Sequence, residues 1–262
     1  SISLRRACRI VGISSVYRYQ PNTARDDAVI VGIQQAVEKY PPYGFSKVFK
    51  ILRRWGHGWN HKRVHRIYCR LNLNKRRRGK KRLPNRYPIQ LTLPETINGC
   101  WSIDFICDSL FCGRRFRTLN IVDDFSREAL AIEIDVGLSA QRVTRVLDRT
   151  VAWRGYPSKL RMDNGPEFIS TTLADWAEEH TIELKFIQPG KPTQNSYVER
   201  FNRTYRDEVL NMYVFKTLSE VRAITEEWID QYNEERPHDA LEDLTLFEYR
   251  EAHLQREYSS LD

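Results

Sequence analysis

The feature that most constrains the fold of this 262-residue chain is a basic run at residues 75–82, where seven of eight side chains are Lys or Arg. Like charges at this density repel one another and cannot form a core. Pro84 and Pro88 follow the run and disfavour helix. We therefore expect two folded parts joined by a basic linker, which we place at residues 75–94.

The two parts differ in charge. Residues 1–82 carry 21 Lys and Arg against three Asp and Glu, a net charge of +18, whereas residues 83–262 carry 21 against 31, a net charge of −10. A basic module is attracted to polyanions, so we predict that the first part binds nucleic acid. A solvated basic surface is the alternative for this part, and a nuclear localisation signal is the alternative for the basic run.

Composition excludes several classes of protein. The chain is 41% apolar and has no uncharged apolar stretch of the roughly 18 residues that a membrane span needs. The first residues show no secretion signal. The five cysteines form no C-x-x-C pair, which disfavours a disulfide scaffold and fits a reducing compartment. We therefore expect a cytoplasmic protein.

Two segments of the basic part have a helix-turn-helix pattern. The first, residues 3–19, is a weak match. In the second, Ser46 is expected to cap a helix that ends near Trp55, a turn follows at 56–58, and Asn60 caps a helix over 61–72. The apolar residues of this last helix recur on one face. We predict that residues 1–74 form a DNA-binding region whose recognition helix presents the cations Lys62, Arg63, Arg66 and Arg70.

Four potential zinc ligands recur every four residues in this region: His57, His61, His65 and Cys69. A structural zinc site needs four ligands on one surface. The glycines on either side of His57 place that residue in a turn, and no cysteine pair completes the set. We therefore favour packing or phosphate contact for these histidines.

The acidic part has alternating strand and helix patterns. We expect helices at 139–154, 171–180 and 195–214, and strands at 100–106, 115–122, 129–136, 159–162 and 182–187. Three strands in succession, followed by alternating helices and strands, predict an α/β fold with a mixed sheet covered by helices. We place this catalytic core at residues 95–214 and a C-terminal helical tail at 215–262.

Three carboxylates stand out in this core. Asp104 lies inside an apolar strand, where an ionised group is costly. Asp163 follows a short strand, and Glu199 lies early in the helix expected at 195–214. Such positions can converge at one edge of a sheet, where hard cations such as Mg²⁺ prefer oxygen ligands. The alternatives are ordinary turn chemistry for Asp163 and a surface position for Glu199.

The three motifs around these residues, at 101–105, 163–168 and 189–202, resemble the catalytic signatures of the D-D-E integrase and transposase superfamily. Thirty-five residues separate Asp163 from Glu199, as in bacterial insertion-sequence transposases of the third (IS-three) family, second reading frame. The resemblance implies an RNase H-like core in which Asp104, Asp163 and Glu199 bind Mg²⁺ or Mn²⁺, with two ions expected. It also implies metal-dependent cleavage and joining of DNA strands in transposition.

The resemblance further assigns DNA contacts to Lys191, Gln194, Asn202 and Arg206. It implies double-stranded DNA (element ends and target) as the partner, homo-oligomers assembled on DNA, and action at the bacterial nucleoid. It adds the upstream reading-frame product as a candidate partner or fusion. A DNA-binding regulator with a silent core is one alternative. A phage or retroelement integrase is another, disfavoured because a zinc-binding N-terminal domain is missing. Within the core, Asp123 and Asp124 are the alternative site residues.

Overall fold

The computed structural model describes residues 3–12, 26–74, 94–188 and 192–259. Contacts divide the chain into two compact units, residues 1–80 and 81–262, and each is described by itself. The predicted linker falls almost wholly on residues outside the described ones, and the boundaries at 74, 94 and 214 stay predictions. Of the first helix-turn-helix segment, the structure describes α1 (Leu4–Ile10), and the second helix expected there lies outside the described residues.

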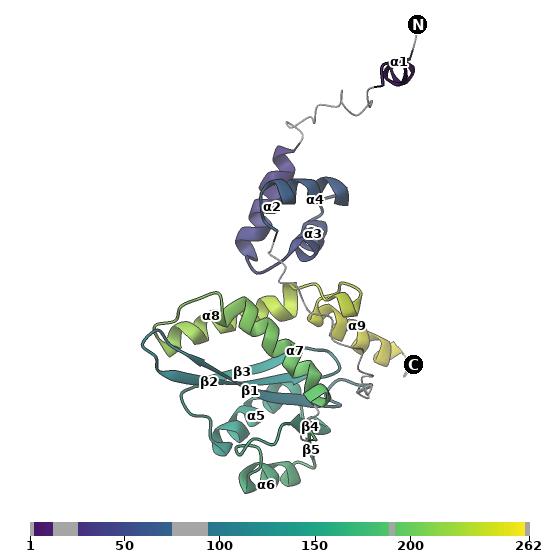
Figure 1. The fold of residues 1–262 in the computed structure, drawn as a ribbon. Helices are drawn as coiled ribbons and strands as arrows, with labels where there is room; N and C mark the ends of the chain where they lie inside the picture. The colour runs from purple at the N-terminus through teal and green to yellow at the C-terminus, as the bar shows by residue number, and fades with distance from the viewer. Residues whose placement is uncertain (1–2, 13–25, 75–93, 189–191, 260–262) are drawn as a thin grey trace. The chain divides into compact units, whose positions relative to one another are not determined.

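The first unit contains α2 (Asp27–Lys39), α3 (Phe45–Arg54) and α4 (His61–Arg70), which share one core (Figure 1). As predicted, the Asn60 side chain caps α4 by accepting a hydrogen bond of 2.8 Å from the Lys62 amide. The predicted cap at Ser46 is wrong, because α3 begins at Phe45 and its N-cap is Gly44, two residues before Ser46. Helix α2 was not predicted. The core is formed by apolar residues with helical spacing on all three helices: Val29, Ile33, Ala36, Val48, Ile51, Leu52, Val64, Ile67 and Tyr68.

The second unit is built on a five-stranded sheet with the strand order β3-β2-β1-β4-β5. Its strands are β1 (Trp101–Ser109), β2 (Arg115–Asp123), β3 (Ala129–Asp135), β4 (Lys159–Met162) and β5 (Glu183–Phe186). Strands β1, β2 and β3 are antiparallel neighbours, whereas β4 runs parallel to β1 and β5 parallel to β4. The predicted mixed α/β sheet is therefore confirmed.

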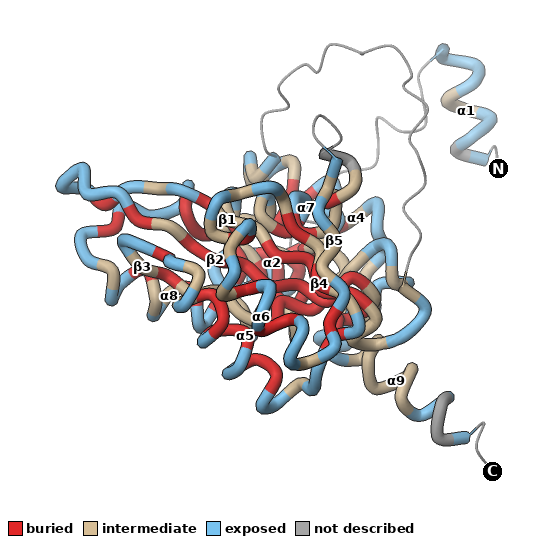
Figure 2. The backbone as a smooth tube through the Cα atoms, turned by 90° about the horizontal axis from the view of Figure 1, so that it is seen from below, coloured by how far each residue is buried: buried red, intermediate tan, exposed pale blue. Residues whose placement is uncertain are grey.

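Helices cover both faces of this sheet (Figure 1). On one face α5 (Ala140–Arg154) and α6 (Thr171–Glu179) pack with alternate residues of β1 and β2, and on the other face α7 (Ser196–Tyr205) packs with the remaining ones. Figure 2 shows that the buried backbone is concentrated in the strands and in the helix segments that face them. Because neighbouring strand residues point to opposite faces, each face has its own core.

The predicted helix over 195–214 is wrong at both ends. A 3-10 turn (Pro192–Asn195) precedes α7, and the α-helix gives way to one π-helical turn (Arg206–Leu210). Val209 and Leu210, in the wide turn, both lie in the core. The local side-chain pattern does not reveal such a turn.

The C-terminal segment is helical and packs on the α7 face as part of the same unit. It contains α8 (Leu218–Asp230), a π turn (Gln231–Glu235), a 3-10 turn (Asp239–Leu241) and α9 (Leu246–Ser259). Trp228 and Tyr232 contact the aromatic rings of α7 at centroid distances of 5.1–5.7 Å. Among the described helices, none is long and apolar enough to cross a membrane.

Candidate active site

Asp104 lies in the middle of β1, on the face of the sheet that α7 covers. The Phe105 amide donates to its Oδ1 atom at 2.8 Å, and the Asn202 side-chain amide on α7 donates to its Oδ2 atom at 2.7 Å. Burial, together with the charges of Asp163 and Glu199, raises the pKa of Asp104 to about 6, although the two hydrogen bonds oppose the shift. Asp163 and Glu199 therefore both lie within electrostatic range of Asp104.

The other two carboxylates are held by local structure. Asp163 directly follows β4, the parallel neighbour of β1, and its Oδ1 atom accepts a 2.9 Å hydrogen bond from the Gly165 amide. A Cβ atom at Gly165 would lie only 3.0 Å from that oxygen, so the close approach favours glycine. Glu199 is exposed in the first turn of α7, where the helix dipole favours an anion, and partial burial of its carboxyl group raises its pKa.

The donor set of these residues fits a hard divalent cation. All three side chains offer carboxylate oxygens, and among the described residues none of them forms an ion pair with Lys or Arg. Their mutual repulsion is what a bound cation relieves. As the side chains stand, no group of three or more His, Cys, Asp or Glu residues in the described ranges is close enough to hold a metal ion. The structure thus places Asp163 and Glu199 near Asp104, with the three side chains farther apart than ligands of one metal ion would be.

Asn202 hydrogen-bonds inside the protein on both sides of its amide. Its Nδ2 atom donates to Asp104, and its Oδ1 atom accepts a 2.6 Å hydrogen bond from Nδ2 of Asn120 on β2. Asn120 is completely buried. Sequence reasoning missed Asn120, because an asparagine inside a strand has no local signature of a role at a site.

The start of α7 is anchored from two directions. The Arg127 guanidinium lies 3.3 Å from the ring centroid of Tyr197, two residues before Glu199. Arg127 has a φ of 65°, a left-handed conformation that is uncommon for a non-glycine residue. Gln194, a predicted DNA contact, accepts a 2.8 Å hydrogen bond from the Gln188 amide through its side chain. Lys191 lies outside the described residues.

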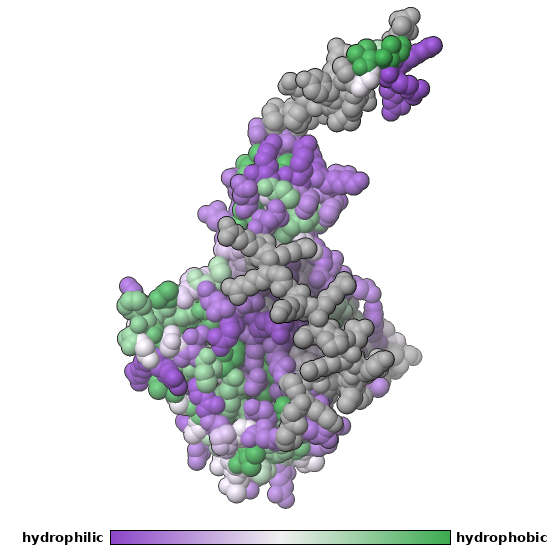
Figure 3. Space-filling view, viewed as in Figure 1, coloured by the Kyte–Doolittle hydropathy of each residue, from purple (hydrophilic) through white to green (hydrophobic). Residues whose placement is uncertain are grey.

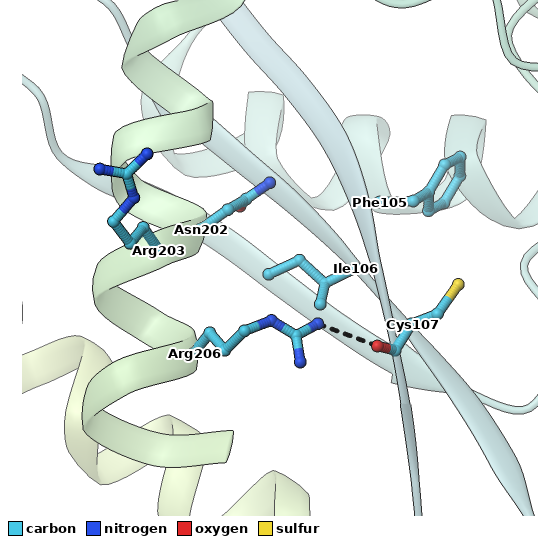
Figure 4. Close-up of a pocket in the computed structure, with 6 residues that line it drawn as sticks. All are labelled: Phe105, Ile106, Cys107, Asn202, Arg203 and Arg206. Carbon is cyan, nitrogen blue, oxygen red and sulfur yellow. Dashed lines mark hydrogen bonds between the residues drawn. The ribbon is translucent and has the colours of Figure 1, made fainter. Parts of the chain in front are cut away.

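An open pocket of about 490 Å³ lies beside Asp104, between β1 and α7 (Figure 4). Ile106 points toward α7, whereas Phe105 and Cys107 point away from it. Arg206, another predicted DNA contact, donates to the Cys107 carbonyl at 2.9 Å and pairs with Asp108 at 3.4 Å. The pocket thus has a cationic wall, formed with Arg203, next to the candidate site.

A second group of carboxylates lies at the end of β2 and is fully buried. It includes Asp123 and Asp124, the alternative site residues, together with Glu128. Arg154 pairs with Glu128 at 2.5 Å and with Asp123 at 3.4 Å, and Arg161 pairs with Asp124 at 2.5 Å. Asp123 is the last residue of β2 and not part of a loop as expected. These ion pairs neutralise the buried carboxylates of the second group, which indicates a structural role for them.

On α4, three of the four predicted cations form ion pairs with one carboxylate. Asp26, which is 1% exposed, pairs with Arg63 at 3.0 Å, with Arg66 at 2.9 Å and, more distantly, with Arg70 at 3.8 Å. The surface of this unit is largely hydrophilic in Figure 3. Sequence reasoning missed Asp26, although it is one of only three acidic residues before residue 83. The histidines of this unit pack against aromatic rings, as in the stacking of His57 on Trp59 at 4.0 Å.

The mixed sheet with its two helical layers defines an integrase core, a class of RNase H-like polynucleotidyl transferases. Two family models described as "Integrase core domain" match residues 94–192 and 180–245, and a model described as "HTH-like domain" matches residues 24–81. A chain of the simian T-cell lymphotropic virus intasome, solved in complex with the PP2A regulatory subunit B56 gamma, has the same fold. Its TM-score is 0.52 at 16% identity, over 84% of this chain and 74% of that one.

Relatives over nearly the whole chain identify the family. The sequence is 43% identical over 255 residues to an uncharacterized 31.7 kDa protein of insertion element IS407 from Burkholderia multivorans, covering 97% of this chain and 92% of the relative. It is 38% identical over 239 residues to a 39.2 kDa protein of insertion element IS476 from Xanthomonas euvesicatoria, covering 90% and 69%. The chain therefore belongs to the insertion-sequence transposases of the IS-three family, as the motifs predicted.

Proposed function

We propose that the chain cleaves and joins DNA strands at the ends of an insertion sequence, with Asp104, Asp163 and Glu199 as its catalytic carboxylates. One observation carries this assignment: on an integrase core, three carboxylates form no ion pair among the described residues, and two of them lie within electrostatic range of Asp104. Their oxygens would hold Mg²⁺ or Mn²⁺, and two ions suit an in-line phosphoryl displacement.

The bound cations would supply charge neutralisation and polarisation of the phosphodiester that reacts. The protein orients their ligands: Asn202 and the Phe105 amide hold the Asp104 carboxylate, and the Gly165 amide holds Asp163. Water first displaces the 3′ oxygen of a phosphodiester and frees a 3′-OH. That hydroxyl then attacks a target phosphodiester, and the phosphorus–oxygen bond opposite it breaks. No covalent protein–DNA intermediate is needed, and Tyr197 has a structural contact instead of a nucleophilic role.

The DNA contacts belong to the same proposal. We assign the element ends to the basic face of α4, with Lys62, Arg63, Arg66 and Arg70, and the reacting strands to Gln194, Asn202 and Arg206 beside the pocket, with Lys191 added from the motif. Paired cleavage at two element ends favours a homo-oligomer on DNA. We also propose the upstream reading-frame product as partner or fusion, and the nucleoid as the place of action.

The test is strand transfer of labelled element-end DNA from the source locus in the presence of Mg²⁺, comparing the wild type with Glu199→Gln. We expect the variant to lose cleavage and to keep DNA binding. Glu178→Gln, on the exposed side of α6, is the matched control and should behave like the wild type. If cleavage survives Glu199→Gln, the site assignment is wrong. Binding without cleavage in both proteins would favour the DNA-binding regulator, or a requirement for the upstream product.

A further inference from the structure

Asn120 is a polar residue at a position where an apolar side chain would make the protein more stable. It lies at the centre of β2, is completely buried, and among the described residues its Oδ1 atom has no hydrogen-bond partner. An unpaired polar atom in a core costs about 1–3 kcal/mol, so an apolar residue of similar volume would be more stable there. What the amide group of Asn120 adds at this position is the 2.6 Å hydrogen bond that it donates to Asn202.

Its position relative to Asp104 is fixed by strand register. Asn120 is the direct cross-strand partner of Asp104 in the antiparallel β1–β2 pair, so both side chains lie on the face that α7 covers. Asn202 reaches from α7 toward the same strands (Figure 4). Its hydrogen bonds, 2.6 Å from Asn120 and 2.7 Å to Asp104, join three elements of the fold.

The direction of this chain of hydrogen bonds follows from chemistry. An ionised carboxylate only accepts, so Asn202 must present its NH₂ group to Asp104. Its carbonyl oxygen then faces Asn120, which must present its own NH₂ group. This leaves the Asn120 oxygen pointing away, as observed. The carboxylate thus sets the orientation of the Asn202 amide, and the hydrogen bond from Asn120 holds that amide in place from its other side.

We infer that Asn120 is a positioning residue for the reaction: its amide donates to Asn202 and so holds the Asn202 side chain against the Asp104 carboxylate. This inference rests on the proposed role of Asp104. Groups of this kind, behind the residues that bind a cation, typically change activity by roughly tenfold to a hundredfold when they are removed. Asn120→Leu removes the donor and keeps similar volume. Thr118→Val is the matched control, because Thr118 is also fully buried on β2, two residues away, with no partner for its hydroxyl among the described residues.

The first measurement needs neither DNA nor metal. In protein labelled with ¹⁵N at asparagine, the side-chain NH₂ signal of Asn202 is assigned by its loss in Asn202→Leu. We expect Asn120→Leu to shift this signal and to speed its exchange with solvent, and Thr118→Val to leave both unchanged. An unchanged Asn202 signal in Asn120→Leu would overturn the inference, whether or not the protein is a transposase.

The second measurement is a double-mutant cycle on the single-turnover rate of strand transfer. We expect Asn120→Leu to slow the reaction by roughly tenfold to a hundredfold with unchanged DNA affinity, and to cause no further loss in the Asn202→Leu background. A rate within about twofold of wild type, or losses that multiply in the double variant, would contradict the inference. If Asn120→Leu fails to fold, Asn120→Val takes its place. A wild type without strand transfer would contradict the proposed function instead, while the NMR result still decides the hydrogen-bond chain.

Discussion

The second unit contains two groups of carboxylates with opposite surroundings. Asp123, Asp124 and Glu128 are buried and paired with Arg154, Arg161 and Arg250 at 2.5–3.4 Å. Asp104, Asp163 and Glu199 are less buried, and among the described residues their hydrogen bonds come from amides and not from cations. Burial raises the pKa of both Asp104 and Asp124, but the nearest charges raise it further at Asp104 and lower it at Asp124. Negative charge is neutralised by arginines within the fold in one group, whereas the other group forms no ion pair among the described residues.

The largest effect is expected from Asp104→Asn. If the first group acts in the chemical step, this substitution lowers strand transfer on the order of a thousandfold or more, to background. Stability should stay the same or rise, because repulsion among the three carboxylates is reduced. Strand-transfer assays and thermal melts measure the two effects, with the exposed Asp175→Asn on α6 as the control. If Asp104→Asn is inactive because it is unfolded, Asp104 is needed for stability, and the two groups of carboxylates do not differ in the way described.

The second group should respond in the opposite way to Arg154→Met. Arg154 is 6% exposed and bridges Asp123 and Glu128, so its loss leaves two buried carboxylates without this partner. We expect a loss of about 3–5 kcal/mol in the free energy of unfolding and a fall in Tm of roughly 10 °C. Arg149→Met removes an exposed ion pair with Glu133 and should cost less than about 1 kcal/mol. Equal effects of the two substitutions would show that the buried network is not what stabilises this end of the sheet.

The pH dependence of stability sharpens the comparison. The pKa of Asp104 is about 6 in the folded protein, against about 4 for an ordinary aspartate, so the folded state binds the proton more tightly. The resulting stabilisation, up to about 3 kcal/mol, is present below pH 4 and is lost as the pH rises through 6. Denaturant titrations at several pH values should show this loss in the wild type and not in Asp104→Asn. Identical pH profiles for the two proteins would contradict the electrostatic account of the site.

The smallest effect concerns the anchoring of α7. Tyr197→Leu removes the ring that contacts the Arg127 guanidinium, a contact worth about 1 kcal/mol, and should slow single-turnover strand transfer by about tenfold or less. Tyr197→Phe retains the ring and should remain close to the wild type. A strong loss in Tyr197→Phe would point to the hydroxyl group, and so to chemistry that the first group of carboxylates does not explain.

The sequence predicted much of this arrangement, because its signals are local. Asp104 could be recognised as a charge inside an apolar strand, and the periodicity of β1 to β5, α5 and α6 gave their positions. Helix α2 was also within reach, since Val29, Ile33 and Ala36 have helical spacing.

What the sequence could not predict depends on contacts between distant elements. Asn120 lies beside Asp104 because of the register between β1 and β2. Arg127 contacts the ring of Tyr197, some 70 residues away in the sequence. The π turn after α7, whose residues Val209 and Leu210 lie in the core, has no local signal in the sequence. Asp123 and Asp124 looked like site residues because the arginines that neutralise them come from α5 and β4.

The three arginines of α4 that share Asp26 have a consequence for the thermodynamics of DNA binding. A cation that contacts a phosphate releases condensed counterions from DNA, and the number released sets how steeply affinity falls with salt. Arg63, Arg66 and Arg70 already have an internal counterion in Asp26. If they contact DNA, the salt dependence should be shallower than three full charges would give, and Asp26→Asn should make it steeper while loosening the order of the three side chains.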